Sequence, residues 1–111
     1  MEPVLNQKLY LEEQGTVPDG SGGFQPIWVS LGTLWGDIQT RAGRGAAIDE
    51  VAGARTGFRI IVRAAPVGAP SRPRPGQRFR NAQRIFRIQS VAEQDAQARY
   101  LRVLVEEEVA K

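Results

Sequence analysis

The 111-residue sequence contains neither cysteine nor histidine. Without cysteine, the chain has no disulfide and offers no thiolate ligand to a metal ion. Without histidine, it lacks the commonest general base near neutral pH and the commonest metal ligand. Acid–base catalysis normally depends on pairs of titratable groups in contrasting environments, and no motif of that kind is evident. We therefore expect a protein that is not an enzyme and that has no catalytic residue, cofactor or metal site.

Long hydrophobic runs are also missing. No stretch approaches the roughly 20 apolar residues that a membrane span requires. Residues 1–4 lack the charged and apolar regions of a secretory signal. The length suits a single hydrophobic core. We therefore expect one soluble, cytosolic domain over residues 1–111, without a membrane partner.

Lysine is scarce, and the basic residues are almost all arginine. Residues 41–87 hold eleven arginines against Asp49 and Glu50, a net charge of +9, whereas the rest of the chain carries −6. Arginine is suited to bind phosphate or carboxylate groups through its planar fork of donors. A biased codon composition would explain the same count. Both explanations stay open.

An arginine-rich segment fits non-specific contact with nucleic-acid phosphates. A sheet that binds single strands would also interleave aromatic residues with the arginines. The nearby Phe58, Phe79 and Phe86 alternate toward the expected core, so we do not expect such interleaving. Trp28 and Trp35 are expected in the core or rim of the domain, with base stacking as the minority hypothesis.

Short alternating runs of apolar and polar residues dominate the chain and predict strands. The alternation changes phase near Gly32-Thr33, which indicates a β-bulge. A glycine-rich loop is expected over 15–25. The fold class is therefore mostly β, a small antiparallel β-barrel or sandwich. The expected strands are Gln7–Gln14, Pro26–Gln39, Phe58–Arg63, Gln77–Asn81, Arg84–Glu93 and Arg99–Val109.

Two connections are longer than a small domain needs. Residues 40–57 break the β pattern and form an inserted arm, in which Ala46–Ala52 has the pattern of a short helix. Residues 64–75 hold four prolines and are expected as a stiff extended loop. Gly43-Arg44-Gly45 lacks the strand–turn–helix context of a phosphate-binding loop. Successive residues on a strand point to opposite faces, so Glu106, Glu107 and Glu108 cannot converge on one metal ion.

The order of these elements resembles that of bacteriophage head–tail joining proteins, also called head-closure or stopper proteins, which include those of gene transfer agents. The resemblance covers nearly the whole chain and departs from the usual pattern at 64–74, where the connection is longer. It is carried by Leu9-Tyr10-Leu11, Trp35-Gly36-Asp37-Ile38, Phe58–Arg63, Arg78-Phe79, Ile85–Val91 and Arg99–Glu107.

The resemblance implies a homo-oligomeric ring in the phage neck, below the portal and its adaptor protein. Such a ring retains the packaged double-stranded DNA in its channel and docks the tail-terminator and tail proteins. The protein would assemble in the bacterial host cytoplasm and remain in the virion. A tail-terminator or other neck ring is the nearest alternative. A non-specific nucleic-acid-binding β-barrel is the alternative from another class.

The resemblance also implies a place for the charged residues. The arm corresponds to the segment that reaches toward the channel in similar proteins. Its arginines either contact DNA phosphates or, as we favour, pair with acidic residues of the next subunit. Opposite charges on successive rings would fix their register. The channel or subunit-interface candidates are Arg41, Arg44, Asp49, Glu50 and Arg55, and the ring-docking candidates are Arg72, Arg74, Glu106, Glu107 and Glu108.

Overall fold

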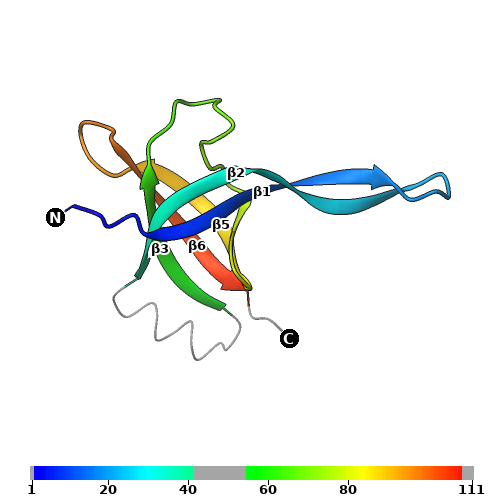
Figure 1. Cartoon of the computed structure of the whole chain (residues 1–111), viewed down its shortest axis with the longest axis horizontal. Coiled ribbons are helices and arrows are strands. Elements are labelled where there is room, and N and C mark those ends of the chain that lie inside the picture. The colour runs from blue at the N-terminus through cyan, green and yellow to red at the C-terminus, as the bar shows by residue number, and fades with distance from the viewer. Residues whose placement is uncertain (1, 42–54, 109–111) are drawn as a thin grey trace.

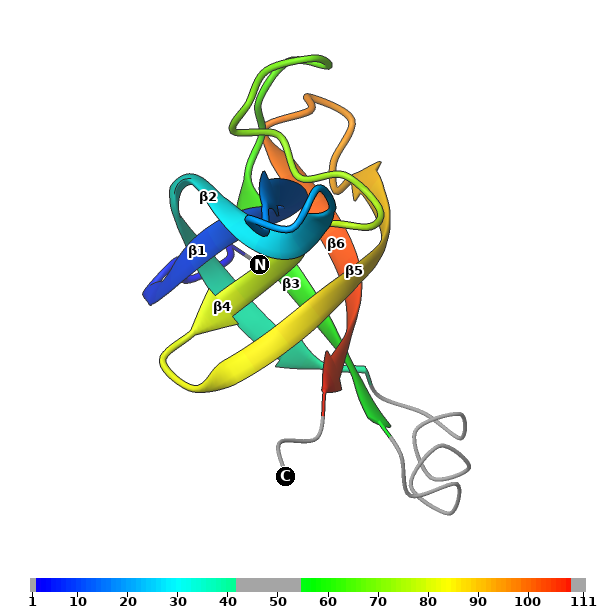
Figure 2. The ribbon, with the colours of Figure 1, turned by 90° about the vertical axis from the view of Figure 1, so that its right-hand side faces the viewer.

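Six antiparallel strands form a closed barrel in the computed structural model of the chain, which describes residues 2–41 and 55–108. The strand order around the barrel is β1-β2-β3-β6-β5-β4 (Figures 1 and 2). The predicted fold class is thereby confirmed. The strands are β1 (Gln7–Pro18), β2 (Phe24–Thr40), β3 (Arg55–Arg63), β4 (Arg78–Asn81), β5 (Arg84–Glu93) and β6 (Tyr100–Glu108).

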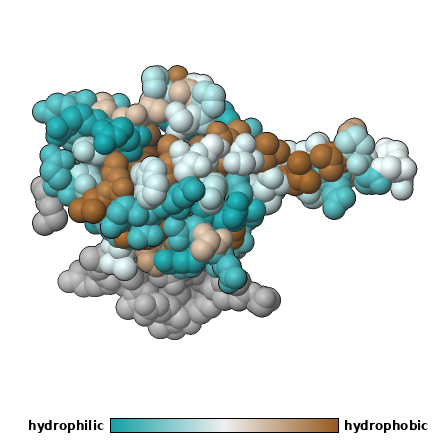
Figure 3. All heavy atoms as spheres, viewed as in Figure 1, coloured by the Kyte–Doolittle hydropathy of each residue, from teal (hydrophilic) through white to brown (hydrophobic). Residues whose placement is uncertain are grey.

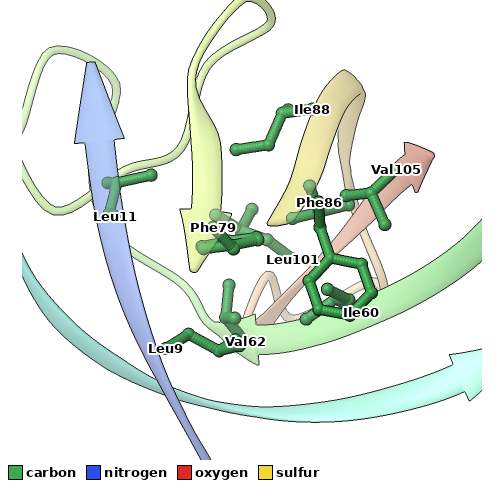
Figure 4. Close-up of a cluster of buried hydrophobic side chains, with 10 residues drawn as sticks. Leu9, Leu11, Ile60, Val62, Phe79, Phe86, Ile88, Leu101 and Val105 are labelled. Atoms are coloured by element: carbon green, nitrogen blue, oxygen red, sulfur yellow. The ribbon is translucent and has the colours of Figure 1, made fainter. Parts of the chain in front are cut away.

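The core fills the barrel with alternate side chains from five of the six strands, which is the expected consequence of the two-residue period of a strand. Phe79 and Phe86 are its largest members and are fully buried. Strand β2 contributes only partly buried residues such as Leu34 and Ile38. The core cluster consists of Leu9, Leu11, Ile60, Val62, Phe79, Phe86, Ile88, Leu101, Val103 and Val105 (Figure 4).

Gly36 gives β2 its close approach to the core. A Cβ atom at this position would lie 2.6 Å from Leu9 Cδ1 and 3.2 Å from the carbonyl oxygen of Ile61. Glycine is therefore required at this position of β2, which is paired with both β1 and β3.

The predicted bulge lies where the phase change indicated it. Leu11 pairs with Gly32 and Glu12 pairs with Ser30, so Leu31 is the additional residue of β2. Gly32 has a φ of 140°, which L-residues rarely adopt. A bulge bends a strand and increases its twist, and here it separates the barrel part of the β1–β2 hairpin from the part that projects beyond it (Figure 1).

The predicted loop over 15–25 is too long. Strand β1 continues to Pro18 and β2 starts at Phe24, so the connection is only residues 19–23. Asp19 Oδ1 accepts hydrogen bonds from the amides of Ser21 at 2.8 Å and Gly23 at 3.1 Å, which closes the turn. The glycines therefore serve a tight turn rather than a long exposed loop.

Other connections follow the sequence more closely. No strand lies in the proline-rich loop, as predicted. The predicted arm is too long at both ends, because β2 continues to Thr40 and β3 begins at Arg55. The helix predicted at Ala46–Ala52 falls outside the described residues. No helix within residues 2–41 and 55–108 is long and apolar enough to cross a membrane.

Candidate functional site

The arm begins and ends at one end of the barrel. Arg55, at the start of β3, pairs with Glu108 at the end of β6, so this end also carries the C-terminal glutamates. Predicted channel and docking residues are thus brought together there. Arg44, Asp49 and Glu50 lie outside the described residues, and their predicted role stays a prediction.

Arg41 is held against the barrel end. Its Nη2 donates hydrogen bonds to Gln89 Oε1 at 3.1 Å and to the carbonyl oxygen of Val105 at 3.0 Å. Gly57 makes room for the guanidinium, because a Cβ there would lie 2.8 Å from Arg41 Nε. Gln89 lies at the second bulge, between Ile88 and Ser90 of β5. Arg41 therefore anchors the root of the arm within its own chain.

The glutamates at the end of β6 are paired with arginines of β5. Arg84 binds Glu107 through two hydrogen bonds of 2.8 and 3.0 Å, and Arg87 Nη1 lies 3.0 Å from Glu108 Oε2. Donating these hydrogen bonds to Glu107 raises the pKa of Arg84 above its ordinary value. The negative charge of Glu107 and Glu108 is therefore compensated within the chain, which weakens their case as a free acidic docking patch.

The two docking candidates in the proline-rich loop also have partners in the chain. Arg72 Nη1 donates to the carbonyl oxygen of Ala65 at 2.9 Å. Arg74 Nη2 lies 2.7 Å from Glu13 Oε1, which also accepts from Gln77 Nε2 at 3.1 Å. The loop is thus fastened to the base of the projecting part of the hairpin.

A buried carboxylate, not singled out from the sequence, joins β1 to β4. Glu12 is 6% exposed, and its two oxygens accept from Arg78 Nε at 2.7 Å and Arg80 Nε at 2.9 Å. Burial alone would raise the pKa of Glu12, but the hydrogen bonds from Arg80 and Arg78 lower it below its ordinary value. The alternation of charge on the outer face of β1 was the available signal, but the pairing of β1 with β4 could not be read from it.

Aromatic and cationic groups alternate along the outer face beside Glu12, which corrects the expectation that they do not interleave. The Arg78 guanidinium lies 4.1 Å from the ring centroid of Trp28, and Arg80 lies 4.7 Å from that of Tyr10. Lys8 Nζ lies 5.5 Å from the ring centroid of Tyr10. The expectation failed because it compared neighbours in sequence, whereas β1 and β2 bring their aromatic residues to β4.

Neither tryptophan belongs to the buried core cluster, and Trp35 is 53% exposed on β2. Of the expected core or rim positions, the buried core is thereby excluded for Trp35. Trp28 is partly buried against Arg78. Trp28 therefore lies where the projecting part of the hairpin meets the barrel, whereas Trp35 lies on the barrel part of β2, paired with Lys8.

The projecting ribbon, which we define as residues 13–18 and 24–29, is unusually apolar for an exposed element. Phe24 is 70% exposed, Val29 42% and Val17 37%. Figure 3 shows hydrophobic atoms along this ribbon, beyond the mainly hydrophilic surface of the barrel. Because residues 15–25 were expected to be a loop, the ribbon was missed as a functional element, although its residues 13–14 and 26–29 were expected to be strand.

The groups on this surface are of the kinds found at protein–protein interfaces. No cluster of three or more potential metal-ligating carboxylates is present in the described part of the chain. Ion pairs, stacked arginines and exposed apolar groups can bind other macromolecules, but they do not form an acid–base pair in a cleft.

Known proteins with the same architecture place it among phage proteins. A family model described as phage head completion protein matches residues 2–108. A chain from the virion of a native gene transfer agent particle is 43% identical, with a TM-score of 0.74 over 99% of this chain and 100% of that chain.

A protein from Shigella flexneri 2a, with a known solution structure, has the same fold at 19% identity, with a TM-score of 0.67 and 96% of each chain covered. No match was found among curated proteins. The match to the family model over residues 2–108 and the relative at 43% identity confirm the resemblance drawn from the sequence. The chain belongs to the phage head completion protein family.

Proposed function

We propose that this protein is a structural neck component that joins the head of a phage or gene transfer agent to its tail. In this proposal it forms a homo-oligomeric ring below the portal and its adaptor protein, retains the packaged DNA and docks the tail. It assembles in the host cytoplasm and stays in the virion. Its role is structural and not enzymatic.

The observation that carries the proposal is the full-length similarity to a chain of a gene transfer agent virion, at 43% identity. Membership of the head completion family supports the same role. The end of the barrel where Arg41 binds the carbonyl oxygen of Val105 and the backbones of Arg55 and Glu108 pair fits a position at the channel or between subunits.

Electron microscopy of particles made with and without this chain tests the proposal. We expect loss of the chain to give separate heads and finished tails, with DNA lost or loosely held. Complementation with the unaltered gene should restore joined particles. Tails of aberrant length would assign the chain to the tail-terminator ring instead. Normal particles would refute a neck role.

The interleaved row of Lys8, Tyr10, Arg80, Arg78 and Trp28 favours nucleic-acid binding as a second candidate function. Binding to phosphates by such a row would weaken steeply with salt, because counterions are released on association. The test is DNA affinity of the isolated chain between about 50 and 200 mM salt. A measurable affinity with a steep slope would support this candidate, and weak binding without a slope would support a purely structural subunit.

A further inference from the structure

The projecting ribbon exposes apolar groups on both of its faces. Cross-strand partners point to the same side of a ribbon, so Gly15, Val17, Ile27 and Val29 share one face. Pro18, Phe24, Pro26 and Trp28 share the other face. An exposed antiparallel ribbon ordinarily has at least one polar face. Apolar exposure on both sides indicates an element that is enclosed by a partner.

The ribbon is also held in a fixed direction. Trp28 packs on Arg78 at its base, and the Arg74–Glu13 ion pair of 2.7 Å fastens the same region to the proline-rich loop. The Asp19 turn closes the tip. Isolated two-stranded ribbons are only marginally stable. These contacts therefore pre-organise the ribbon and reduce the conformational entropy that it loses on binding a partner.

An apolar pocket that suits such a ribbon lies elsewhere on the same chain. It has a volume of about 330 Å³ and lies between the start of the proline-rich loop and the β5–β6 turn. Val67 at its edge is 85% exposed. The ribbon points away from the barrel (Figures 1 and 2), so the chain does not fill this pocket itself. The lining residues are Ala64, Ala65, Pro66, Val67, Ala98 and Leu101, with Arg72 and Glu93 at the charged rim.

The charges at the two places are complementary. Asp19 is the only charged residue between positions 14 and 29 of the sequence. It is exposed at the tip, where hydrogen bonds from the amides of Ser21 and Gly23 lower its pKa and keep it ionised. The guanidinium of Arg72 at the pocket rim has five N–H donors, and one of them is used in a hydrogen bond to the carbonyl oxygen of Ala65 among the described residues. Glu93 lies on the same rim and would repel the Asp19 carboxylate. The ribbon tip is therefore expected to approach the pocket from the side of Arg72.

We propose that the ribbon of one subunit docks into this pocket on a second copy of the chain, with Phe24 entering beside Val67 and Asp19 facing Arg72. Ribbon and pocket are different surfaces, so the contact is heterologous and propagates from subunit to subunit until a ring closes. This inference rests on the proposed ring and names the contact that builds it.

Disulfide cross-linking tests the contact directly, because the chain has no cysteine of its own. Phe24→Cys and Val67→Cys are combined in one full-length chain, which is oxidised and run on a non-reducing gel. We expect a ladder of covalent oligomers. An equimolar mixture of the two single variants should give a hetero-dimer and no ladder, because each chain then has one half of the contact.

Phe24→Cys combined with Gln83→Cys is the matched control. Gln83 is exposed in the β4–β5 turn, away from the pocket. This pair should give no ladder. A ladder as strong as that of the first pair would show random collision and overturn the proposal.

The association state, measured by sedimentation on the same samples and in particles, separates this inference from the proposed function. Oligomers that form without the Phe24–Val67 cross-link would overturn the ribbon contact and leave the ring standing. Cross-linking of Phe24→Cys to a different virion protein would also overturn it. Absence of any self-association, in solution and in particles, would refute the ring itself. In agreement with the proposal, Phe24→Asp should weaken self-association about tenfold or more while the urea midpoint of the barrel stays unchanged.

Discussion

Glu12 is the single charged residue whose removal should affect the fold most, because it compensates two arginines where β1 meets β4. Glu12→Gln leaves Arg78 and Arg80 without an anionic partner. We expect a loss of about 1–3 kcal/mol in the free energy of unfolding, kept at this modest level because Arg80 is partly solvated. Urea denaturation measures it. Glu13→Gln, which alters the exposed pair with Arg74, is the matched control and should cost about 0–1 kcal/mol. Equal effects of the two changes would contradict this assignment.

The same carboxylate makes stability depend on acid. The pKa of Glu12 is lower in the fold than its ordinary value of 4.5, despite its burial, because of Arg80 and Arg78. Its contribution is therefore complete above about pH 4.5 and is lost as the pH falls through the folded-state pKa. We expect the urea midpoint to decrease as the pH is lowered below that value. The decrease should be smaller in Glu12→Gln. Asp19 and Asp95 have lowered pKa values too, so part of the acid dependence should remain. An identical pH profile for the two proteins would exclude Glu12 as a source.

Gly36 is a second position where one atom decides the packing. Gly36→Ala places a methyl group 2.6 Å from Leu9 Cδ1 in the core, where the side chain has little freedom to move. We expect a cost of about 1–3 kcal/mol in chemical denaturation. Gly15→Ala on the ribbon is the control, because its nearest neighbour is the exposed Val29 at 3.1 Å. A tolerated Gly36→Ala would mean that β1 and β2 can separate locally.

At the scale of elements, the ribbon tip depends on Asp19 alone for its side-chain hydrogen bonds among the described residues. Asp19→Ala removes the acceptor for the amides of Ser21 and Gly23. We expect faster hydrogen exchange at these two amides and little change in the unfolding of the barrel, because exposed turns open locally. Asp19→Asn keeps an acceptor oxygen and should restore much of the protection. Slow exchange in Asp19→Ala would show that the glycine turn closes without its side chain.

Strands with one buried face could be predicted well, and elements stabilised by distant contacts could not. The β5 bounds agree with prediction because Phe86 and Ile88 face the core and polar residues face outward. The outer part of the ribbon was missed because the glycines and prolines of residues 15–25 indicated a loop, although residues 26–29 were correctly expected to be strand. Sequence distance likewise concealed the charge pairing: arginines of the central segment meet acids of β1 and β6 through the antiparallel ladder, as in Arg84–Glu107.

At the scale of the whole molecule, the barrel is closed by its shortest strand pairing, between β1 and β4. Only Tyr10, Leu11 and Glu12 of β1 pair with β4. Phe79 fills the core directly behind this seam and is fully buried. We expect Phe79→Ala to cost about 3–5 kcal/mol in the free energy of unfolding, measured by urea denaturation.

Phe24→Ala is the whole-molecule control for that change. The same side chain is removed, but Phe24 is 70% exposed on the ribbon. Its effect on unfolding should stay within about 0.5 kcal/mol. A comparable loss for both variants would mean that the ribbon and the barrel unfold as one unit.

Strands β1 and β2 run without interruption from the barrel into the ribbon, and this continuity has a mechanical consequence. A pull on the ribbon along its length acts parallel to the strands and perpendicular to the ladder hydrogen bonds. The load is then shared in shear by the β1–β4 and β2–β3 pairings together, and the bonds do not open one after another. A force applied to the ribbon would thus reach the barrel wall distributed over both pairings.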